Sequence, residues 1–174
     1  MELKIAISLI EKGIQPDASQ RWADLGSGKG LFTTALSKLI GAGSEIYAID
    51  KDGSALKQVA GASHVTINTI KADFINGVDG ISELDGILMA NSLHFVRDKV
   101  VLLKMLSTHL KKNGRFIIIE YDTDKSNMWV PYPISSKKLT DLVQVNNLGV
   151  TEKIGATDSA YQSSGMYSMM INLN

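Results

Sequence analysis

The sequence contains no cysteine in 174 residues. A chain without thiols has no disulfide framework, catalytic thiolate, iron–sulfur cluster or thiolate zinc site. Proline is scarce, with three in the chain, and no apolar run approaches the ~20 residues that cross a bilayer. The first residues carry acidic side chains within a short apolar stretch, unlike a signal peptide. We therefore expect no membrane partner and, most simply, a cytoplasmic protein.

Net charge is also lacking, because 18 basic residues balance 18 acidic ones. A neutral chain has no whole-surface positive field to attract nucleic acid, so no nucleic-acid partner is expected. The three histidines, at positions 64, 94 and 109, are scattered and share no metal-ligand spacing, so no metal site is expected. Hydrophobic residues make up 44% of the chain, as in ordinary globular proteins. The length suits a single domain over residues 1–174.

Segments typical of strands and of helices alternate along the chain. Apolar residues at helical spacing predict helices, and short β-branched or continuously apolar runs predict strands. The expected strands span 21–25, 45–49, 65–70, 85–90, 115–120, 150–154 and 166–173. The expected helices span 3–13, 32–40 and 54–60, with a fourth capped by Asp98 and reaching Leu110, and a fifth capped by Ser135 and ending before Gly149. Asn113-Gly114 is expected to turn the chain into its fifth strand.

This alternation predicts the fold class. Strands that are apolar without alternation are buried on both faces, as in a parallel sheet covered by helices. Two strands that follow each other without a helix at the end of the chain predict an antiparallel hairpin. The sequence thus predicts an α/β fold: a doubly wound, Rossmann-like, mostly parallel seven-stranded sheet with a C-terminal antiparallel hairpin.

The most specific motif is the glycine-rich segment Asp24-Leu-Gly-Ser-Gly-Lys-Gly30, between the first strand and the following helix. Glycines let the backbone turn tightly and let a ligand approach it closely. A dinucleotide fingerprint would need a small residue where Leu31 stands, and a phosphate-binding P-loop would need Ser or Thr where Gly30 stands. The carboxylate of Asp24 favours a cationic ligand over a pyrophosphate. An NAD(P)-dependent oxidoreductase is therefore the weaker alternative.

The Asp24–Gly30 segment resembles the first motif of class I S-adenosylmethionine-dependent methyltransferases, (D/E)-x-G-x-G-x-G, and the resemblance extends over about residues 20–173. It implies S-adenosylmethionine as cofactor and transfer of its methyl group to a small-molecule acceptor by in-line displacement. The family places a ribose-binding acid at the end of the second strand, here Asp50, and adenine contacts after the third, here Asp73 and Phe74. The cofactor-binding residues that the resemblance implies are Asp24, Gly26, Ser27, Gly28, Gly30, Asp50, Lys51, Asp73, Phe74 and Asn91.

Several of these assignments have a structural alternative. Asp50 lies beside other charged residues and would serve equally as a solvated turn acid. Asp73 is also a suitable helix cap, and Phe74 a suitable core residue. A chain that keeps this fold as a non-catalytic binding module is a second alternative, because fold alone does not establish activity.

The acceptor side of the site is expected after the fourth and fifth strands. His94, as general base, and Asn91 are the candidate catalytic residues, and Tyr121 and Tyr132 the candidate substrate-binding residues. Alternatively, His94 is a packed polar residue and Trp129–Pro133 a packed loop. The segment from Asn91 lacks the Asn/Asp-Pro-Pro-Tyr/Phe signature of methyltransferases that act on adenine or glutamine. Little chain remains for a substrate domain, so a second subunit, in a homodimer, is one expected source of specificity.

Overall fold

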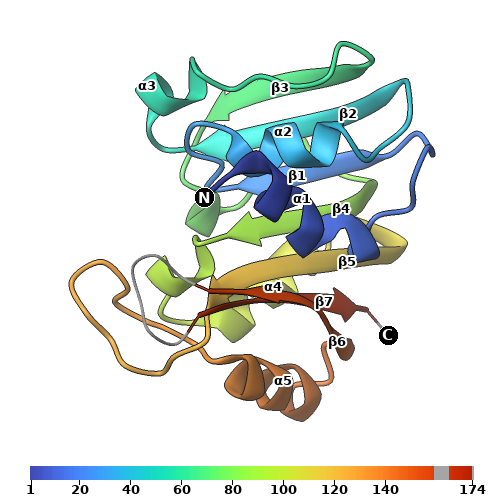
Figure 1. Cartoon of the computed structure of the whole chain (residues 1–174). Coiled ribbons are helices and arrows are strands. Elements are labelled where there is room, and N and C mark those ends of the chain that lie inside the picture. The colour runs from blue at the N-terminus through green and yellow to red at the C-terminus, as the bar shows by residue number, and fades with distance from the viewer. Residues whose placement is uncertain (159–164, 174) are drawn as a thin grey trace.

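The computed structural model describes residues 1–158 and 165–173, and these form one seven-stranded sheet (Figure 1). The strands are β1 Arg21–Leu25, β2 Ser44–Asp50, β3 Val65–Lys71, β4 Leu84–Ala90, β5 Leu110–Tyr121, β6 Val150–Thr157 and β7 Met166–Asn172. Their order is β3-β2-β1-β4-β5-β7-β6, with β7 antiparallel to both neighbours and every other pair parallel. The predicted fold class is confirmed.

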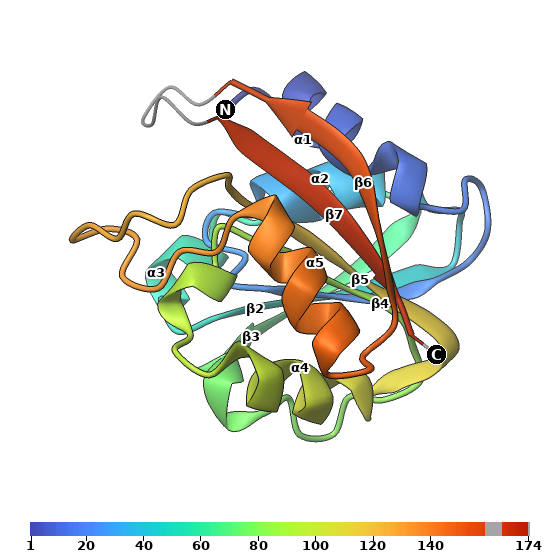
Figure 2. The same ribbon diagram turned by 90° about the horizontal axis from the view of Figure 1, so that it is seen from below.

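Helices cover both faces of the sheet (Figures 1 and 2). The helices are α1 Leu3–Ile10, α2 Leu31–Ser37, α3 Gly53–Leu56, α4 Lys99–Ser107 and α5 Ser136–Val145, and three short 3-10 turns are η1 Glu11–Gly13, η2 Phe74–Asn76 and η3 Leu93–Phe95. Helices α1 and α2 pack on one face, and α4 and α5 on the other. Successive strand residues serve opposite faces: Trp22 packs in the cluster with α1 and α2, while Ala23 packs in the cluster with α4 and α5. None of the helices in the described part of the chain is long and apolar enough to cross a membrane.

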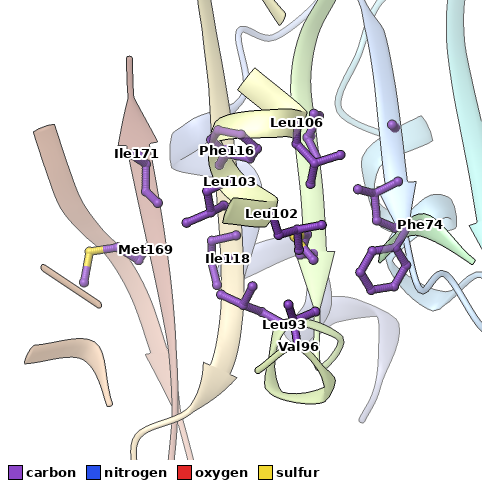
Figure 3. Close-up of a cluster of buried hydrophobic side chains, with 14 of the residues drawn as sticks. Phe74, Leu93, Val96, Leu102, Leu103, Leu106, Phe116, Ile118, Met169 and Ile171 are labelled. Carbon is purple, nitrogen blue, oxygen red and sulfur yellow. The ribbon is translucent and has the colours of Figure 1, made fainter. Parts of the chain in front are cut away.

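The core on the α4 side also supports the turn after β4. Leu102, Leu103 and Leu106 of α4 pack in one cluster with the apolar side chains of β4 and β5 (Figure 3). Leu93 and Val96, at either end of the turn η3, are buried in the same cluster. The backbone of η3 is therefore fixed by the core, and the residues between these two anchors are held at the edge of the sheet.

Several predicted boundaries are wrong. The helix capped by Asp98 ends at Ser107 rather than Leu110, since β5 already begins at Leu110. Asn113 and Gly114 lie inside β5 and not in a turn before it. The pairing of β4 with β5 shifts in register here, from Leu84 opposite Leu110 to Gly86 opposite Arg115. The additional residues of β5 bulge out of the ladder, which is the physical reason that a turn signal occurs within a strand.

The helix expected over 54–60 is also shorter than predicted, because it spans only Gly53–Leu56. Its cap is Asp52, whose carboxylate accepts hydrogen bonds from the N–H groups of Ser54 and Ala55 at 2.8 and 3.3 Å. The helix that begins after Ser135 ends at Val145, a turn earlier than expected. Strand β6 extends to Thr157 because it pairs with β7 along its length.

Candidate cofactor site

The chain leaves β1 through three glycines in the left-handed conformation. The φ angles of Gly26, Gly28 and Gly30 are +76°, +53° and +83°, values that side-chain-bearing residues rarely adopt. A Cβ added to Gly26 would lie 2.5 Å from Cβ of Ser92, so this position has no room for a side chain. A Cβ added to Gly28 would meet no atom within 4 Å. Gly28 therefore borders open space through which a ligand can reach the backbone.

Asp50, the last residue of β2, holds this loop in place. Its Oδ2 accepts a hydrogen bond from the N–H of Gly28 at 2.8 Å, and its Oδ1 accepts one from the N–H of Asp52 at 2.8 Å. The N–H of Gly26 also donates to the carbonyl of Ile49 at 2.8 Å. Asp50 is thus a structural tie between the loop and β2, and it is not merely a solvated turn acid.

A cavity opens beside the loop, at the carboxyl ends of the parallel strands. It has a volume of about 460 Å³, counting the part open to solvent. The residues that line it come from the segments after β1, β2, β3 and β4: Gly26, Asp50, Lys51, Ala72, Asp73, Phe74, Ile75, Asn91, Ser92 and Phe95. Six of the ten predicted cofactor-binding residues are therefore brought together around one cavity.

The other four predicted residues are Asp24, Ser27, Gly28 and Gly30, which belong to the loop but are not among the cavity-lining residues. Asp24 lies beneath the loop and is almost fully buried, with 1% of its surface exposed. The hydroxyl of Thr33 donates a hydrogen bond of 2.6 Å to its Oδ2. Burial raises the pKa of the Asp24 carboxyl to about 7; the Thr33 hydrogen bond opposes this rise and the charge of Asp50 adds to it.

Two polar atoms around the loop have no hydrogen-bond partner among the described residues, namely Oγ of Ser27 and Oδ1 of Asn91. A buried polar atom without a partner is costly, and such atoms are rare in native proteins. Asn91 is also held at φ +53° at the end of β4, and its N–H donates to the carbonyl of Ile119 at 2.9 Å. These orphaned atoms fit a ligand that brings hydroxyl or amino groups, and S-adenosylmethionine carries both.

The structure gives Asp73 and Phe74 the structural roles of helix cap and core residue, while both remain beside the cavity. Oδ1 of Asp73 accepts a hydrogen bond from the N–H of Ile75 at 3.2 Å and so caps η2. Phe74 is buried in the core cluster shown in Figure 3. Both residues nevertheless line the cavity. The cap and the core contact fix the backbone there without withdrawing either residue from the cavity.

His94, in the turn η3, is held by a buried acid that the sequence reasoning missed. Nδ1 of His94 lies 2.7 Å from Oε2 of Glu120, and the N–H of His94 donates to Oε1 of Glu120 at 3.0 Å. The side chains of both residues are buried. A glutamate directly after the buried apolar run of residues 116–119 requires a partner, and this is the signal that would have found it.

Tyr132 reaches His94 through its backbone. Its N–H donates to the carbonyl of His94 at 2.9 Å. The ammonium of Lys99, also missed, donates to the carbonyls of Val96 and Tyr132, each at 2.7 Å. Burial lowers the pKa of Lys99, and the negative charge of Glu120 opposes this shift. Lys99 therefore fastens the loop that carries Tyr132 to the turn that carries His94.

The aromatic residues on the acceptor side differ in their surroundings. The ring of Tyr121 lies 6.2 Å from that of His94, measured between centroids, but Trp129 is 78% exposed. His94, Tyr121 and Tyr132 are not among the cavity-lining residues, although Phe95, whose ring centroid is 4.3 Å from that of His94, is. The acceptor candidates thus form a group next to the cavity. Among the described residues, no cluster of three or more histidine or acidic side chains could hold a metal ion.

A glycine loop after β1, with acids after β2 and β3 at the carboxyl edge of a mostly parallel sheet, defines a Rossmann-like site for a nucleoside-containing ligand. Residues 23–116 match the family model of the methyltransferase domain, which is more than half of the chain. The chain therefore belongs to the methyltransferase-domain family. This domain uses S-adenosylmethionine, so the predicted enzyme class and cofactor are confirmed over the NAD(P)-dependent alternative.

Solved structures of low sequence identity share the fold. A 1,6-didemethyltoxoflavin-N1-methyltransferase from Burkholderia thailandensis is 15% identical over 99% of this chain and 78% of its own, with a TM-score of 0.71. A possible histamine N-methyltransferase from Thermotoga maritima is 16% identical over 99% of this chain and 89% of its own, with a TM-score of 0.70. A methyltransferase from Aquifex aeolicus is 15% identical over the whole of both chains, with a TM-score of 0.67. No curated protein matches the sequence.

Proposed function

We propose that this methyltransferase binds S-adenosylmethionine in the cavity beside the glycine loop and methylates a small molecule held near His94. The observation that carries the proposal is the convergence of Gly26, Asp50, Asp73 and Asn91, from four separate segments, on one cavity. Two of the structural neighbours are named for small-molecule acceptors, 1,6-didemethyltoxoflavin and, possibly, histamine. This supports a small-molecule acceptor for the present chain.

The polar residues of the cavity suit the different parts of the cofactor. Each carboxylate oxygen of Asp50 accepts one backbone N–H, which leaves further lone pairs for the two ribose hydroxyls. Asp73 and Phe74 line the cavity, and we propose that they contact the amino group and the ring face of adenine. The unpaired oxygens of Ser27 and Asn91 accept from the donors of the ligand. Asp24 contributes negative charge beneath the loop, close to where a cationic ligand binds.

S-adenosylmethionine, when bound, supplies a methyl group that is activated by the positive charge on sulfur. The protein then has to orient the acceptor and exclude water, which is the main source of rate in such a displacement. We propose that Tyr121 and Tyr132 contact the acceptor and that His94 removes its proton. Asn91 borders both the cavity and η3, so it is placed to contact cofactor and acceptor alike.

The test is calorimetric titration with S-adenosylmethionine and S-adenosylhomocysteine of the wild type, Gly28→Leu and Gly80→Leu. Gly80 is the matched control, because it too has a positive φ, +77°, and a Cβ there would also meet no atom within 4 Å. We expect wild type and Gly80→Leu to bind with one site per chain and Gly28→Leu to lose at least tenfold in affinity. Absence of binding by the wild type, or equal loss in both variants, would contradict the proposed site.

The cytoplasmic location, the homodimer and the lack of a nucleic-acid partner stay predictions. The homodimer has a direct check, the molar mass of the purified chain measured by light scattering. A mass near twice 18.9 kDa is expected for the dimer.

A further inference from the structure

The contact between His94 and Glu120 restricts where the proton of the imidazole ring can lie. Both oxygens of Glu120 face donors on one residue: Oε1 the backbone N–H of His94 and Oε2 the ring nitrogen Nδ1. An ionised carboxylate only accepts hydrogen bonds. Nδ1 must therefore carry the proton in the neutral ring, and the lone pair is left on Nε2. No hydrogen bond to Nε2 is formed within residues 1–158 and 165–173.

A buried cation lies close to Glu120. The ammonium of Lys99 is held nearby by two backbone carbonyls and faces the negative charge of Glu120. Other ionisable groups of this region are the carboxylates of Asp122 and Asp124 and the phenols of Tyr121, Tyr132 and Tyr167. Lys99 is thus the buried cation that compensates the carboxylate.

The ring of His94 is also fixed in position. Leu93 and Val96, on either side of it, are buried in the core, and the carbonyl of His94 accepts the N–H of Tyr132. Glu120 in turn cannot rotate without losing its bond to the backbone N–H of His94. A base whose position and tautomer are fixed in advance is suited to proton transfer.

We infer that Glu120 is a positioning residue that keeps the proton of His94 on Nδ1, so that Nε2 acts as the base toward acceptors that carry a removable O–H or N–H proton; this rests on the proposed function. In the transfer, the acceptor oxygen or nitrogen bonds to the methyl carbon while the carbon–sulfur bond breaks and its electron pair goes to sulfur. The acceptor proton goes to Nε2. The imidazolium then faces the carboxylate of Glu120 at 2.7 Å, which stabilises it.

The tautomer is measured by nitrogen NMR of protein labelled with ¹⁵N in its histidine rings. The chain has three histidines, so His64→Gln and His109→Gln assign the signals by elimination. At a pH where the ring is neutral, we expect a protonated Nδ1 and an unprotonated Nε2 for His94. A proton on Nε2 in the wild type would overturn the inference, because Nδ1 would then accept from a protonated Glu120.

Glu120→Gln is the informative variant, because an amide has one acceptor oxygen for two N–H donors. We expect the His94 ring of this variant to shift at least in part to the tautomer protonated on Nε2. Asp24→Asn is the control, since it also replaces a buried acid with an amide but does not contact His94. An unchanged tautomer in a folded Glu120→Gln, or the same change in Asp24→Asn, would overturn the inference. If Glu120→Gln does not fold, the tautomer of His94 in the wild type still tests the inference.

Calorimetry separates this inference from the proposed function. Glu120 does not line the cavity, so Glu120→Gln should bind S-adenosylhomocysteine within about threefold of the wild type. A wild type that does not bind the cofactor would refute the proposed function, whatever the tautomer. A wild type that binds it with His94 protonated on Nε2 would refute only the role of Glu120.

Discussion

Asp24→Asn should make the free protein more stable near neutral pH. Because burial raises the folded-state pKa of Asp24 from 3.8 to about 7, the folded protein binds this proton more tightly than the unfolded chain. The contribution of Asp24 to the stability of the folded protein is therefore most favourable below pH 4 and is lost as the pH rises through 7. At ~1.36 kcal/mol per pKa unit, the difference above pH 7 is about 4 kcal/mol as an upper limit. The asparagine avoids this cost and keeps an oxygen for the Thr33 hydroxyl.

The assay is urea unfolding of the wild type and Asp24→Asn at pH 4.5, 6 and 8, followed by circular dichroism. We expect the stability advantage of the variant to grow with pH and to level off above pH 7. The other acids titrate in both proteins, so their contribution cancels in the difference between the two unfolding free energies. An advantage that is constant with pH, or largest at pH 4.5, would refute the burial argument.

The same carboxylate should favour a cation bound above it. Binding of S-adenosylmethionine should then tighten as the pH rises from 6 to 8 and should release a proton from Asp24. Calorimetry in two buffers of different ionisation enthalpy measures this proton. Asp24→Asn should bind more weakly at pH 8. It should also release no proton at pH 6, where Asp24 of the free wild type is mostly protonated, and proton release at pH 6 equal to that of the wild type would show that another group is responsible.

Three further substitutions test the supports of the site. Lys99→Met should lower the unfolding free energy by about 1–3 kcal/mol in urea, since it removes hydrogen bonds to two backbone carbonyls, one of them buried. Lys104→Met, at an exposed position, should change it by less than about 0.5 kcal/mol. Phe74→Ala should lower the unfolding free energy by about 3 kcal/mol in the same assay, because the ring is part of the core. It should also weaken S-adenosylhomocysteine binding in calorimetry, because the ring lines the cavity. Loss of stability with unchanged affinity would contradict a role of the ring in cofactor binding. Trp129→Ala should leave the melting temperature within about 1 °C, since the side chain is 78% exposed, and a large drop would show that its loop is packed.

The sequence was sufficient to predict which residues lie at the carboxyl edge of the sheet. Asp50 and Asp73 could be assigned to one edge because the carboxyl ends of parallel strands meet there, whatever the details of packing. The end of the helix before β5 was not predictable in the same way. Asn113-Gly114 is a turn signal in the local sequence. In the structure the pairing of β5 with β4 continues past these residues, which are accommodated within β5 as a bulge.

Glu120 and Lys99 were missed for a related reason. Each is separated by many residues from its partners in the sequence, 26 positions between Glu120 and His94 and 33 between Lys99 and Tyr132. Nothing in local spacing brings such pairs together, and only the placement of β5 beside β4 does so. The one available clue was a charged residue in a segment otherwise fit for burial.

The most direct test of the account is a crystal structure of the chain with S-adenosylhomocysteine. We expect the ligand in the cavity beside Gly26 and Gly28, with its ribose hydroxyls on the carboxylate of Asp50 and a donor on Oδ1 of Asn91. A ligand bound elsewhere, or one in the cavity that leaves both Asp50 and Asn91 without contact, would contradict the assignment of this cavity as the cofactor site.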